Sequence, residues 1–489
     1  MGFNRSFRLI GLQRGLFINL KLGLMRYDFL VLGGGSAGYA AARTAHDLGA
    51  KVGVVDGAQE LGGLCILRGC MPSKTLLYAA EALHNARLGS AFGLRIPEAE
   101  ADLAAMQRRK REVIREFAEY RQGQLEDGRF ELHRSTASFR DSSSVVLSDG
   151  SVLQADKILV ATGSTFNLPN VAGLSDLPVR TSDDVLDLSE VPEEVVVLGG
   201  GVVACELAQY LSRVGSRVTI IQRSSRLLKD YSPETSAVVE EAFRDEGMEL
   251  FLDTTLQRFE NLPSGKALIV FEHQGKPHSL ETGFLFNALG RRPQVDDLNL
   301  VAAGIKTLPT GHILTNPFQQ TTNPSVYAAG DCSGPHEIVH VAIRQGETAA
   351  SHAFGVRCSA MDYDGLMRVV FTDPQVASVG LDPEEIERRG IDFSSSSYPF
   401  DDHGKSILME AKRGHVAVHA ERSSGRILGA ECVGKDAGEL IHSLSVAISL
   451  KATAKDLLKA DWYHPTLSEI WTYPIEELAE GCDENDDSV

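Results

Sequence analysis

The chain has 489 residues, which is too long for one hydrophobic core, so two to four domains are expected. Its net charge of −18 argues against a nucleic acid or an anionic membrane as partner, because phosphate binding requires a basic face. The sequence contains no apolar run long enough to span a membrane. Seven cysteines in so long a chain do not make a disulfide scaffold, which favours a reducing compartment such as the cytoplasm.

The two ends of the chain differ from the rest in charge. Residues 1–26 carry five arginines and lysines and no acid, as organelle transit peptides can. The interpretation we favour is an upstream start codon, because Met25 directly precedes the first predicted strand. At the other end, residues 479–489 are predicted to form a disordered acidic tail.

A strand, a glycine-rich turn and a helix follow the leader. The apolar run "DFLVL" at 28–32 predicts a buried parallel strand, "GGGSAG" at 33–38 follows it, and an Ala-rich helix comes next. A second strand, "KVGVVD", ends in Asp56, where a carboxylate can accept a hydrogen bond from a ribose hydroxyl. This pattern predicts a dinucleotide site with the pyrophosphate at the helix N-terminus, contacted by Gly33, Gly35, Ser36 and Gly38.

The same pattern returns later in the chain. Strands are predicted at 194–198 and 217–221, with Gly199 and Gly201 in the turn that follows the first of them. Two dinucleotide sites in one polypeptide favour one flavin and one nicotinamide, since electrons can pass between the two carriers only if both are held.

The second unit departs from the pattern after its second strand. Gln222 replaces the usual carboxylate, and Arg223 follows it, with Arg226 and Lys229 nearby. An arginine here attracts the 2′-phosphate of NADPH, which a carboxylate would repel. The sequence therefore favours NADPH over NADH, and the alternative is a solvated basic turn.

Two cysteines lie five positions apart in "GGLCILRGCMPSK" at 62–74. From the residues alone, Cys65 and Cys70 could form a metal clip, a structural disulfide or a redox pair. A zinc site would need a second cysteine or histidine pair nearby, and none follows at ligand spacing, so no metal is predicted.

With this stretch between the two glycine motifs, the chain resembles the pyridine nucleotide–disulfide oxidoreductases, the flavoenzymes that include dihydrolipoamide dehydrogenase, glutathione reductase and mercuric reductase. The likeness runs from about Tyr27 to about Leu478. It also covers "ATGS" at 161–164, "YAAGD" at 327–331 and "HPTLSE" at 464–469.

The resemblance implies an α/β protein with two Rossmann-like dinucleotide-binding domains, for FAD and NAD(P), and a C-terminal α+β dimerisation domain. The expected parts are a leader (1–26), the FAD-binding domain (27–178 and 296–360), the NAD(P)-binding domain (179–295), the dimerisation domain (361–478) and the tail (479–489).

The resemblance also implies roles for residues around the thiols. Cys65 and Cys70 would form a redox-active disulfide beside FAD, with Cys70 nearer the flavin and Cys65 exchanging with substrate. Lys74 would approach the flavin and pair with Glu206, because a paired carboxylate makes a buried ammonium tolerable. Asp331 would accept a hydrogen bond from the ribityl chain of FAD. Small residues would let the chain pass close to this cofactor at Ala161, Thr162 and Gly163.

His464 and Glu469 match the family's C-terminal acid–base pair. A carboxylate fixes the imidazole tautomer and raises its basicity, and the imidazole can then exchange protons with thiols. In the family this pair reaches the disulfide of the partner subunit, so the resemblance implies a homodimer.

The substrate is less well determined than the mechanism. "HPTLSE" resembles dihydrolipoamide dehydrogenase. Glu347 replaces an arginine that holds glutathione in glutathione reductases, although Arg43 matches another such arginine. Mercuric reductases carry a C-terminal cysteine pair, whereas Cys482 stands alone here.

We expect a dihydrolipoamide dehydrogenase-like enzyme that acts on a small disulfide or dithiol. Mercuric reductase-like and glutathione reductase-like enzymes are the alternatives. A non-catalytic flavoprotein subunit is a further alternative, and it conflicts with the intact set of reactive residues.

Overall fold

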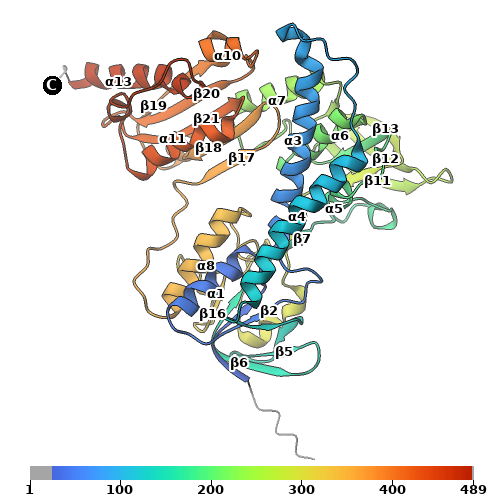
Figure 1. The fold of residues 1–489 in the computed structure, drawn as a ribbon, viewed down its shortest axis with the longest axis vertical. Coiled ribbons are helices and arrows are strands. Elements are labelled where there is room, and N and C mark those ends of the chain that lie inside the picture. Colours follow the sequence, from blue (N-terminus) through green and yellow to red (C-terminus); the bar gives the residue numbers. More distant parts are fainter. Residues whose placement is uncertain (1–24, 487–489) are drawn as a thin grey trace, which may run out of the picture.

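The computed structural model describes the backbone of residues 25–486 and the side chains of residues 25–481. It contains a body around a large sheet, drawn blue to teal at the bottom of Figure 1, and a second body drawn in green and yellow. A third body, drawn in orange and red, contains the last sheet and its helices. The predicted α/β class, with two Rossmann-like units and a C-terminal α+β unit, is confirmed by the strand order of the sheets.

The first sheet has the order β3-β2-β1-β6-β5-β4, and β16 also pairs with β6. Strands β3, β2, β1, β6 and β16 run parallel, and residues 29–32 of β1 are fully buried, as expected for a strand covered on both faces. The strands are β1 (Met25–Leu32), β2 (Val52–Val55), β3 (Glu131–His133), β4 (Ala137–Phe139), β5 (Ser144–Leu147), β6 (Val152–Val160) and β16 (Val326–Ala328).

Helices α1 (Ser36–Asp47) and α8 (Val339–Ala353) lie side by side on this sheet (Figure 1). Their backbones touch, because a Cβ on Gly346 would lie 2.3 Å from the carbonyl oxygen of Ala37. At the start of α1, a Cβ on Gly38 would lie 1.8 Å from the carbonyl oxygen of Gly33, whose φ is +107°. The turn between β1 and α1 therefore has room for glycine only.

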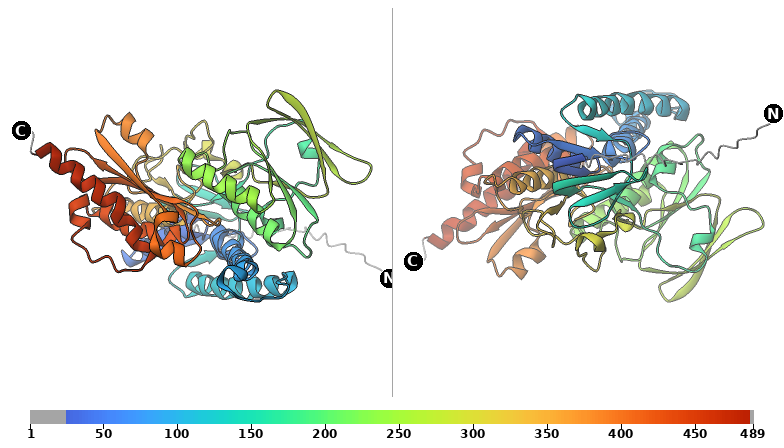
Figure 2. Two further views of the ribbon diagram at one scale, coloured as in Figure 1. Left: turned by 90° about the horizontal axis from the view of Figure 1, so that it is seen from above. Right: turned by 90° about the horizontal axis from the view of Figure 1, so that it is seen from below.

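Three further helices carry the cysteine stretch and cover it. They are α2 (Gly63–Arg68), α3 (Cys70–Arg87) and α4 (Leu103–Glu126). Helix α4 packs against both α2 and α3. In both views of Figure 2, α3 and α4 lie together on one side of the molecule, outside the sheets.

The second Rossmann-like unit has a parallel sheet of order β10-β9-β8-β14 and an antiparallel sheet β11-β12-β13. A short pair, β7 (Ser164–Phe166) with β15 (Arg291–Pro293), joins this unit to the first. The other elements are α5 (Ser182–Leu186), β8 (Glu194–Leu198), α6 (Val202–Val214), β9 (Arg217–Ile221), α7 (Pro233–Asp245), β10 (Glu249–Phe251), β11 (Thr254–Asn261), β12 (Ala267–His273), β13 (Lys276–Thr282) and β14 (Leu285–Asn287).

The C-terminal unit is an antiparallel sheet of order β17-β18-β21-β20-β19. Helices α11 and α13 share one hydrophobic core with it, centred on the fully buried Trp471. Its elements are β17 (Met367–Val370), β18 (Gln375–Gly380), α9 (Pro383–Arg388), β19 (Phe393–Pro399), α10 (Gly404–Leu408), β20 (His415–Glu421), β21 (Ile427–Gly434), α11 (Ala437–Ser449), α12 (Ala454–Leu457) and α13 (Thr472–Asp486).

Both predicted ends need correction. Met25 and Arg26, assigned to the leader, begin β1, and Arg26 pairs with Asp156 at 2.5 Å. Residues 1–24 lie outside the described part. Helix α13 continues through Asp486, so the predicted disorder of the acidic tail is wrong up to that residue.

A buried ion network joins the second and third units. The Arg213 guanidinium, 5% exposed, binds Glu246 at 2.7 Å and Asp373 at 2.9 Å. Glu246 follows α7, whereas Asp373 belongs to the C-terminal unit. The network therefore fixes how these units sit against each other.

We expect Arg213→Met to lower the free energy of unfolding by about 3 kcal/mol, because it leaves two carboxylates partly buried without their cation. Urea unfolding followed by fluorescence measures this. Arg217→Met is the matched control, since Arg217 is 70% exposed and pairs with an exposed Glu193. Equal stability of the two variants would contradict a structural role for the network.

Candidate functional site

Cys65 and Cys70 lie where two helices meet. Cys65 is in α2, Cys70 is the first residue of α3, and Gly69 separates the helices with φ −127° and ψ −116°. This junction brings the two half-buried side chains together as free thiols that interact by a hydrogen bond. The closeness of the two thiols is compatible with the predicted disulfide, which stays a prediction.

The two thiols have opposite acidities. The hydrogen bond from Cys65 lowers the pKa of Cys70 to about 6, and the Lys74 ammonium lowers it further against the effect of burial. The same hydrogen bond, together with burial, raises the pKa of Cys65. At neutral pH the negative charge therefore resides on Cys70, and Cys65 keeps its proton.

Lys74 and Glu206 form the predicted ion pair, with 2.7 Å between Nζ and Oε2. The Glu206 side chain is 3% exposed, and its second oxygen accepts the amide hydrogen of Phe371 at 2.9 Å. The Lys74 ammonium also lies 4.7 Å from the centre of the Phe371 ring. Because these residues belong to α3, to α6 and to the segment after β17, all three units meet beside the thiols.

The first glycine turn leaves space for a phosphate. At Gly35 a Cβ would meet only the Cα of Gly63, at 3.8 Å, so the side of the turn that faces the helix N-terminus is open. Gly33, by contrast, is pressed against Ala161, whose carbonyl oxygen would lie 2.3 Å from an added Cβ. Asp56 accepts the Gly34 amide hydrogen at 2.8 Å and thereby holds the turn. These residues fit the pyrophosphate and ribose of FAD.

The return of the chain to this unit carries the other predicted FAD contacts. The Thr162 hydroxyl donates to the carbonyl oxygen of Gln294 at 2.7 Å, and Gly163 adopts φ +73°. Asp331 accepts a hydrogen bond from the Ser164 hydroxyl at 2.6 Å. Arg291, which the sequence analysis missed, donates to the same hydroxyl at 2.7 Å. Its only sequence signal was the dipeptide "RR", which is common in surface turns.

The second glycine turn has the same geometry. Gly199 has φ +110° and lies against Ala288, whereas a Cβ on Gly201 would meet nothing within 4 Å. Arg223 is exposed beyond β9, and its amide donates to Oε1 of the buried Gln222 at 3.0 Å. Arg226 is instead held by the carbonyl oxygen of Lys229 at 2.9 Å. Arg223 therefore has the exposed side chain, whereas Arg226 is bonded within the turn.

His464 and Glu469 are brought together in the C-terminal unit. The imidazole Nδ1 lies 2.8 Å from the Glu469 carboxylate, whose other oxygen accepts the Thr466 amide hydrogen at 3.1 Å. Burial acts to raise the pKa of Glu469, but these hydrogen bonds outweigh it and the pKa falls below its usual range. The His464 side chain is 75% exposed, so its other ring nitrogen is free to meet a molecule from outside.

Most of the remaining cysteines have no access to substrate. Cys205, Cys332 and Cys432 are fully buried, and burial raises the pKa of each of them. Cys358 is half-buried, and the side chain of Cys482 lies outside the described residues. In the described part of the chain, Cys65 and Cys70 are the thiols that sit beside a cation and an open turn.

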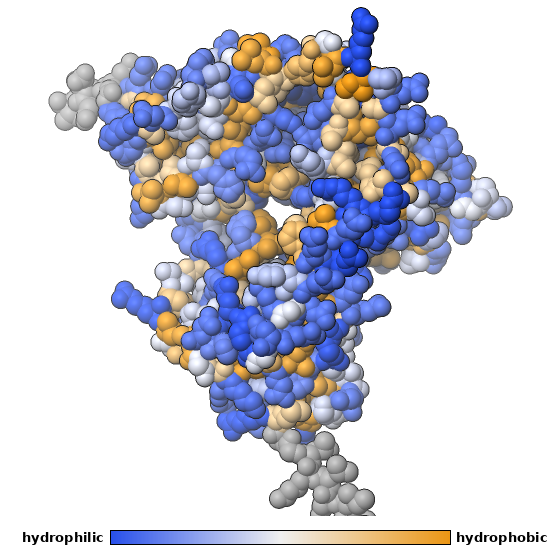
Figure 3. Space-filling view, viewed as in Figure 1, coloured by the Kyte–Doolittle hydropathy of each residue, from blue (hydrophilic) through white to orange (hydrophobic). Residues whose placement is uncertain are grey.

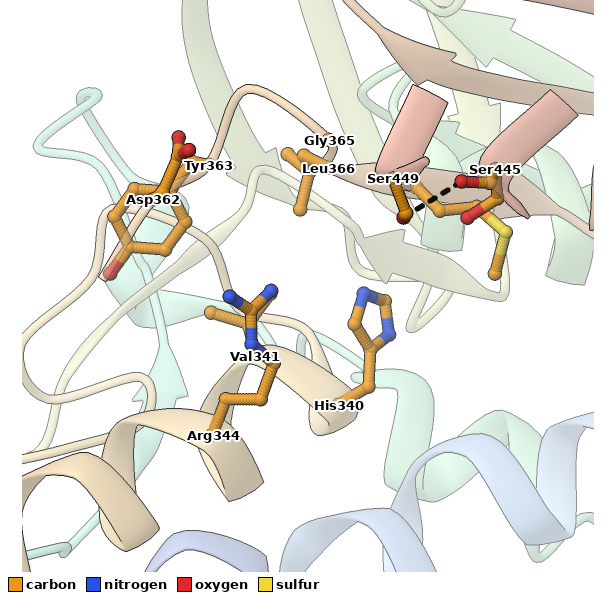
Figure 4. Close-up of a pocket in the computed structure, with 10 residues that line it drawn as sticks. His340, Val341, Arg344, Asp362, Tyr363, Gly365, Leu366, Ser445 and Ser449 are labelled. Carbon is orange, nitrogen blue, oxygen red and sulfur yellow. Dashed lines mark hydrogen bonds between the residues drawn. The ribbon is translucent and has the colours of Figure 1, made fainter. Parts of the chain in front are cut away.

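A hollow between α8 and α11 lies apart from this set of residues (Figure 4). Its lining includes none of the predicted cofactor or catalytic residues, and the Ser449 hydroxyl donates to the Ser445 carbonyl oxygen within it. The polar residues around it are His340, Arg344, Asp362, Tyr363, Ser445 and Ser449.

The comparisons with known proteins agree with this geometry. Residues 27–346 match the family described as pyridine nucleotide-disulphide oxidoreductase, and residues 366–474 match the dimerisation domain of that family. The chain belongs to the pyridine nucleotide-disulphide oxidoreductase family, which confirms the resemblance, the enzyme class and the cofactors FAD and NAD(P)H.

The similar proteins include two of the three kinds of enzyme that the sequence resembles, mercuric reductase and dihydrolipoamide dehydrogenase. A mercuric reductase of Lysinibacillus sphaericus is 35% identical over 444 residues, which is 91% of this chain and 81% of the relative. A dihydrolipoyl dehydrogenase of Chlamydia muridarum is 32% identical over 449 residues, which is 91% of this chain and 95% of the relative. The HOCl-induced flavoprotein disulfide reductase RclA from Escherichia coli has the same fold, with a TM-score of 0.82 at 23% identity over 92% of this chain and 99% of RclA.

The acidity of Cys70 gives a pH prediction. In the enzyme with reduced thiols and oxidised FAD, we expect the long-wavelength absorbance of a thiolate beside the flavin to be lost as pH falls through about 6. Lys74→Met should move this midpoint to higher pH, because a nearby cation stabilises the thiolate. Anaerobic absorbance titration measures it. Lys459→Met, at a 76% exposed lysine, is the control, and an unchanged midpoint in Lys74→Met would contradict the assignment.

Proposed function

We propose that this protein is an FAD-dependent NAD(P)H:disulfide oxidoreductase that exchanges electrons with a small disulfide or dithiol, in the manner of dihydrolipoamide dehydrogenase. The observation that carries the proposal is the contact between Cys65 and Cys70 beside the Lys74–Glu206 pair. Two thiols of opposite acidity are what a two-step disulfide exchange requires. We place the protein in the cytoplasm, where free thiols persist.

Bound FAD would supply a two-electron link between the nicotinamide and the thiol pair. Cys65 gives up its proton and attacks one sulfur of the substrate disulfide, forming a mixed disulfide and releasing the first substrate thiol. The Cys70 thiolate then attacks the Cys65 sulfur, which forms the Cys65–Cys70 disulfide and releases the second substrate thiolate. Two electrons have then passed to the substrate, and reversal of these steps oxidises a dithiol.

The acid–base partner of Cys65 is proposed to be His464 of the partner subunit. Among the described hydrogen bonds of the chain, His464 makes none with either thiol, and its exposed side carries no partner. Large apolar side chains are exposed on the C-terminal unit, including Val446, Leu450 and Tyr463 at 59%, 75% and 78%. Figure 3 shows hydrophobic surface over this unit and around the hollow below it. A homodimer would cover these side chains and complete the site.

Glutathione disulfide and Hg²⁺ are the alternative substrates, and a charge argument bears on the first of them. Arg43, which matches a glutathione-contacting arginine, is held by Glu347 at 2.6 Å and is therefore already neutralised. This pair disfavours glutathione disulfide. Reduction of Hg²⁺ is the second candidate, because mercuric reductases are among the relatives and thiolates bind soft metals.

Initial rates of NADPH oxidation test the proposal. We expect turnover with lipoamide that exceeds turnover with glutathione disulfide or Hg²⁺, and its loss in Cys65→Ser and in His464→Gln. The reason is that each variant removes one partner of the exchange step. Higher turnover with Hg²⁺ than with lipoamide would favour the second candidate, and a protein inert toward every oxidant would support the non-catalytic alternative.

A subunit-exchange experiment tests whether the active site is built from residues of two subunits. Subunit exchange between Cys65→Ser and His464→Gln dimers should restore activity, because mixed dimers carry one site with both residues intact. Absence of recovery in verified mixed dimers would contradict a site built from two subunits.

The nicotinamide preference is tested at Arg223. We expect Arg223→Ala to raise the KM for NADPH by about 10- to 100-fold and to leave that for NADH nearly unchanged, because only NADPH carries the phosphate that a guanidinium binds. Steady-state kinetics with both nucleotides measures this. Lys229→Ala, at a 57% exposed lysine of the same turn, is the control. Better turnover of the unaltered enzyme with NADH would overturn the NADPH assignment.

A further inference from the structure

Arg121 on α4 is a partly buried cation that has no carboxylate partner within the described part of the chain. Its guanidinium lies over the Tyr39 ring at 4.2 Å from the ring centre, and its Nε donates to Gln124 Oε1 at 3.1 Å. Its Nη1 is buried and has no hydrogen-bond partner among the described residues. Burial lowers the pKa of this guanidinium, yet arginine stays charged at any pH at which proteins work.

Other arginines of the chain, by contrast, are paired with carboxylates. Arg43, one turn after Tyr39 on α1, is held by Glu347 at 2.6 Å. The deeply buried Arg213 has two carboxylates, and Arg129 has Asp127 at 2.8 Å. A buried N–H without an acceptor costs free energy in the free protein, and that cost disappears when an anionic ligand provides the acceptor.

The uncompensated charge lies beside the substrate side of the thiol pair. Helix α4 packs on α2, which carries Cys65. Cys65 acts to raise and Arg43 to lower the pKa of Arg121, so both groups lie near its guanidinium. One turn before Arg121, Phe117 is 42% exposed, and the adjacent Tyr120 is 69% exposed. This stretch of α4 therefore offers an apolar surface next to a cation.

We propose that Arg121 binds a carboxylate of the small disulfide substrate, whose disulfide reaches Cys65 while its hydrocarbon part lies along Phe117 and Tyr120. This inference rests on the proposed function and narrows its substrate class. The substrate is a disulfide with an aliphatic chain that ends in a carboxylate, as in free lipoate, in place of the neutral amide of lipoamide. Arg121 is a specificity-determining residue and takes no part in the exchange of electrons.

Lipoate and lipoamide form a matched pair of probes, because they share one disulfide ring and differ in the charge at the far end. In the FAD-loaded dimer with NADPH, we expect kcat/KM to be higher for lipoate. Arg121→Met should lower kcat/KM for lipoate by about 10- to 100-fold, mainly through KM, and change that for lipoamide by less than about threefold. Arg121→Lys should recover part of the loss.

Two controls complete the experiment. Arg115→Met removes an arginine of the same helix that is 66% exposed and should leave both substrates unaffected. A second pair, dithiodipropionate against hydroxyethyl disulfide, repeats the charge comparison on open-chain disulfides. The same preference for the acid, abolished in Arg121→Met, would show that the effect belongs to the carboxylate and not to the lipoyl ring.

Each outcome decides between the proposals. Equal loss for the acid and the neutral partner in Arg121→Met would mean that Arg121 acts on the Cys65 thiol, and it would overturn the inference. If Arg121→Met weakens the dimer and leaves the substrate preference unchanged, a carboxylate of the partner subunit binds Arg121. That result would also overturn the inference. Equal use of lipoate and lipoamide by the unaltered enzyme overturns the inference but leaves the proposed function intact. No turnover of any disulfide overturns the proposed function itself.

Discussion

The Lys74–Glu206 ion pair is the interaction on which the rest of the site depends. Glu206 is almost fully buried on α6, Lys74 is one turn after Cys70 on α3, and the Phe371 amide hydrogen of the C-terminal unit binds the same carboxylate. An ammonium and a carboxylate held this closely make each other's burial tolerable, and neither can move without exposing the other's charge. The pair therefore fixes three units around the thiols while it keeps a positive charge beside Cys70.

The interior of the fold could be predicted because its signals are local. Strands expected at 194–198 and 217–221 have these bounds in the structure as β8 and β9, since the stretch of a parallel strand that is covered on both faces is mostly apolar. The glycine turns were equally predictable from the sequence, because a Cβ on Gly33 or Gly199 would clash with a backbone carbonyl oxygen. In both cases the sequence requirement arises within a few residues of the element it defines.

Features that depend on distant residues could not be read in this way. The acidic residues after 479 predict a solvated tail, yet α13 continues through them because its first turns are packed against β19 and β20. Arg121 stands among six other arginines and lysines in residues 108–129 and looks like any cation on a solvated helix. Only the approach of Tyr39 from α1 shows that its guanidinium is covered. Arg43 and Glu347 were each noticed in the sequence, but their pairing depends on the packing of α1 against α8.

The shared family frame also explains why relatives with different substrates resemble this chain almost equally. The thiol pair, the ion pair and the glycine turns all lie in residues 27–346, the part of the chain that matches the pyridine nucleotide-disulphide oxidoreductase family. We propose that substrate choice rests instead on a few charged side chains near Cys65. The charge of Arg43 is neutralised within the chain, whereas the buried Nη1 of Arg121 has no acceptor among residues 25–481. We expect such a site to favour a disulfide that carries a negative charge, because a neutral substrate would leave the Arg121 N–H without an acceptor.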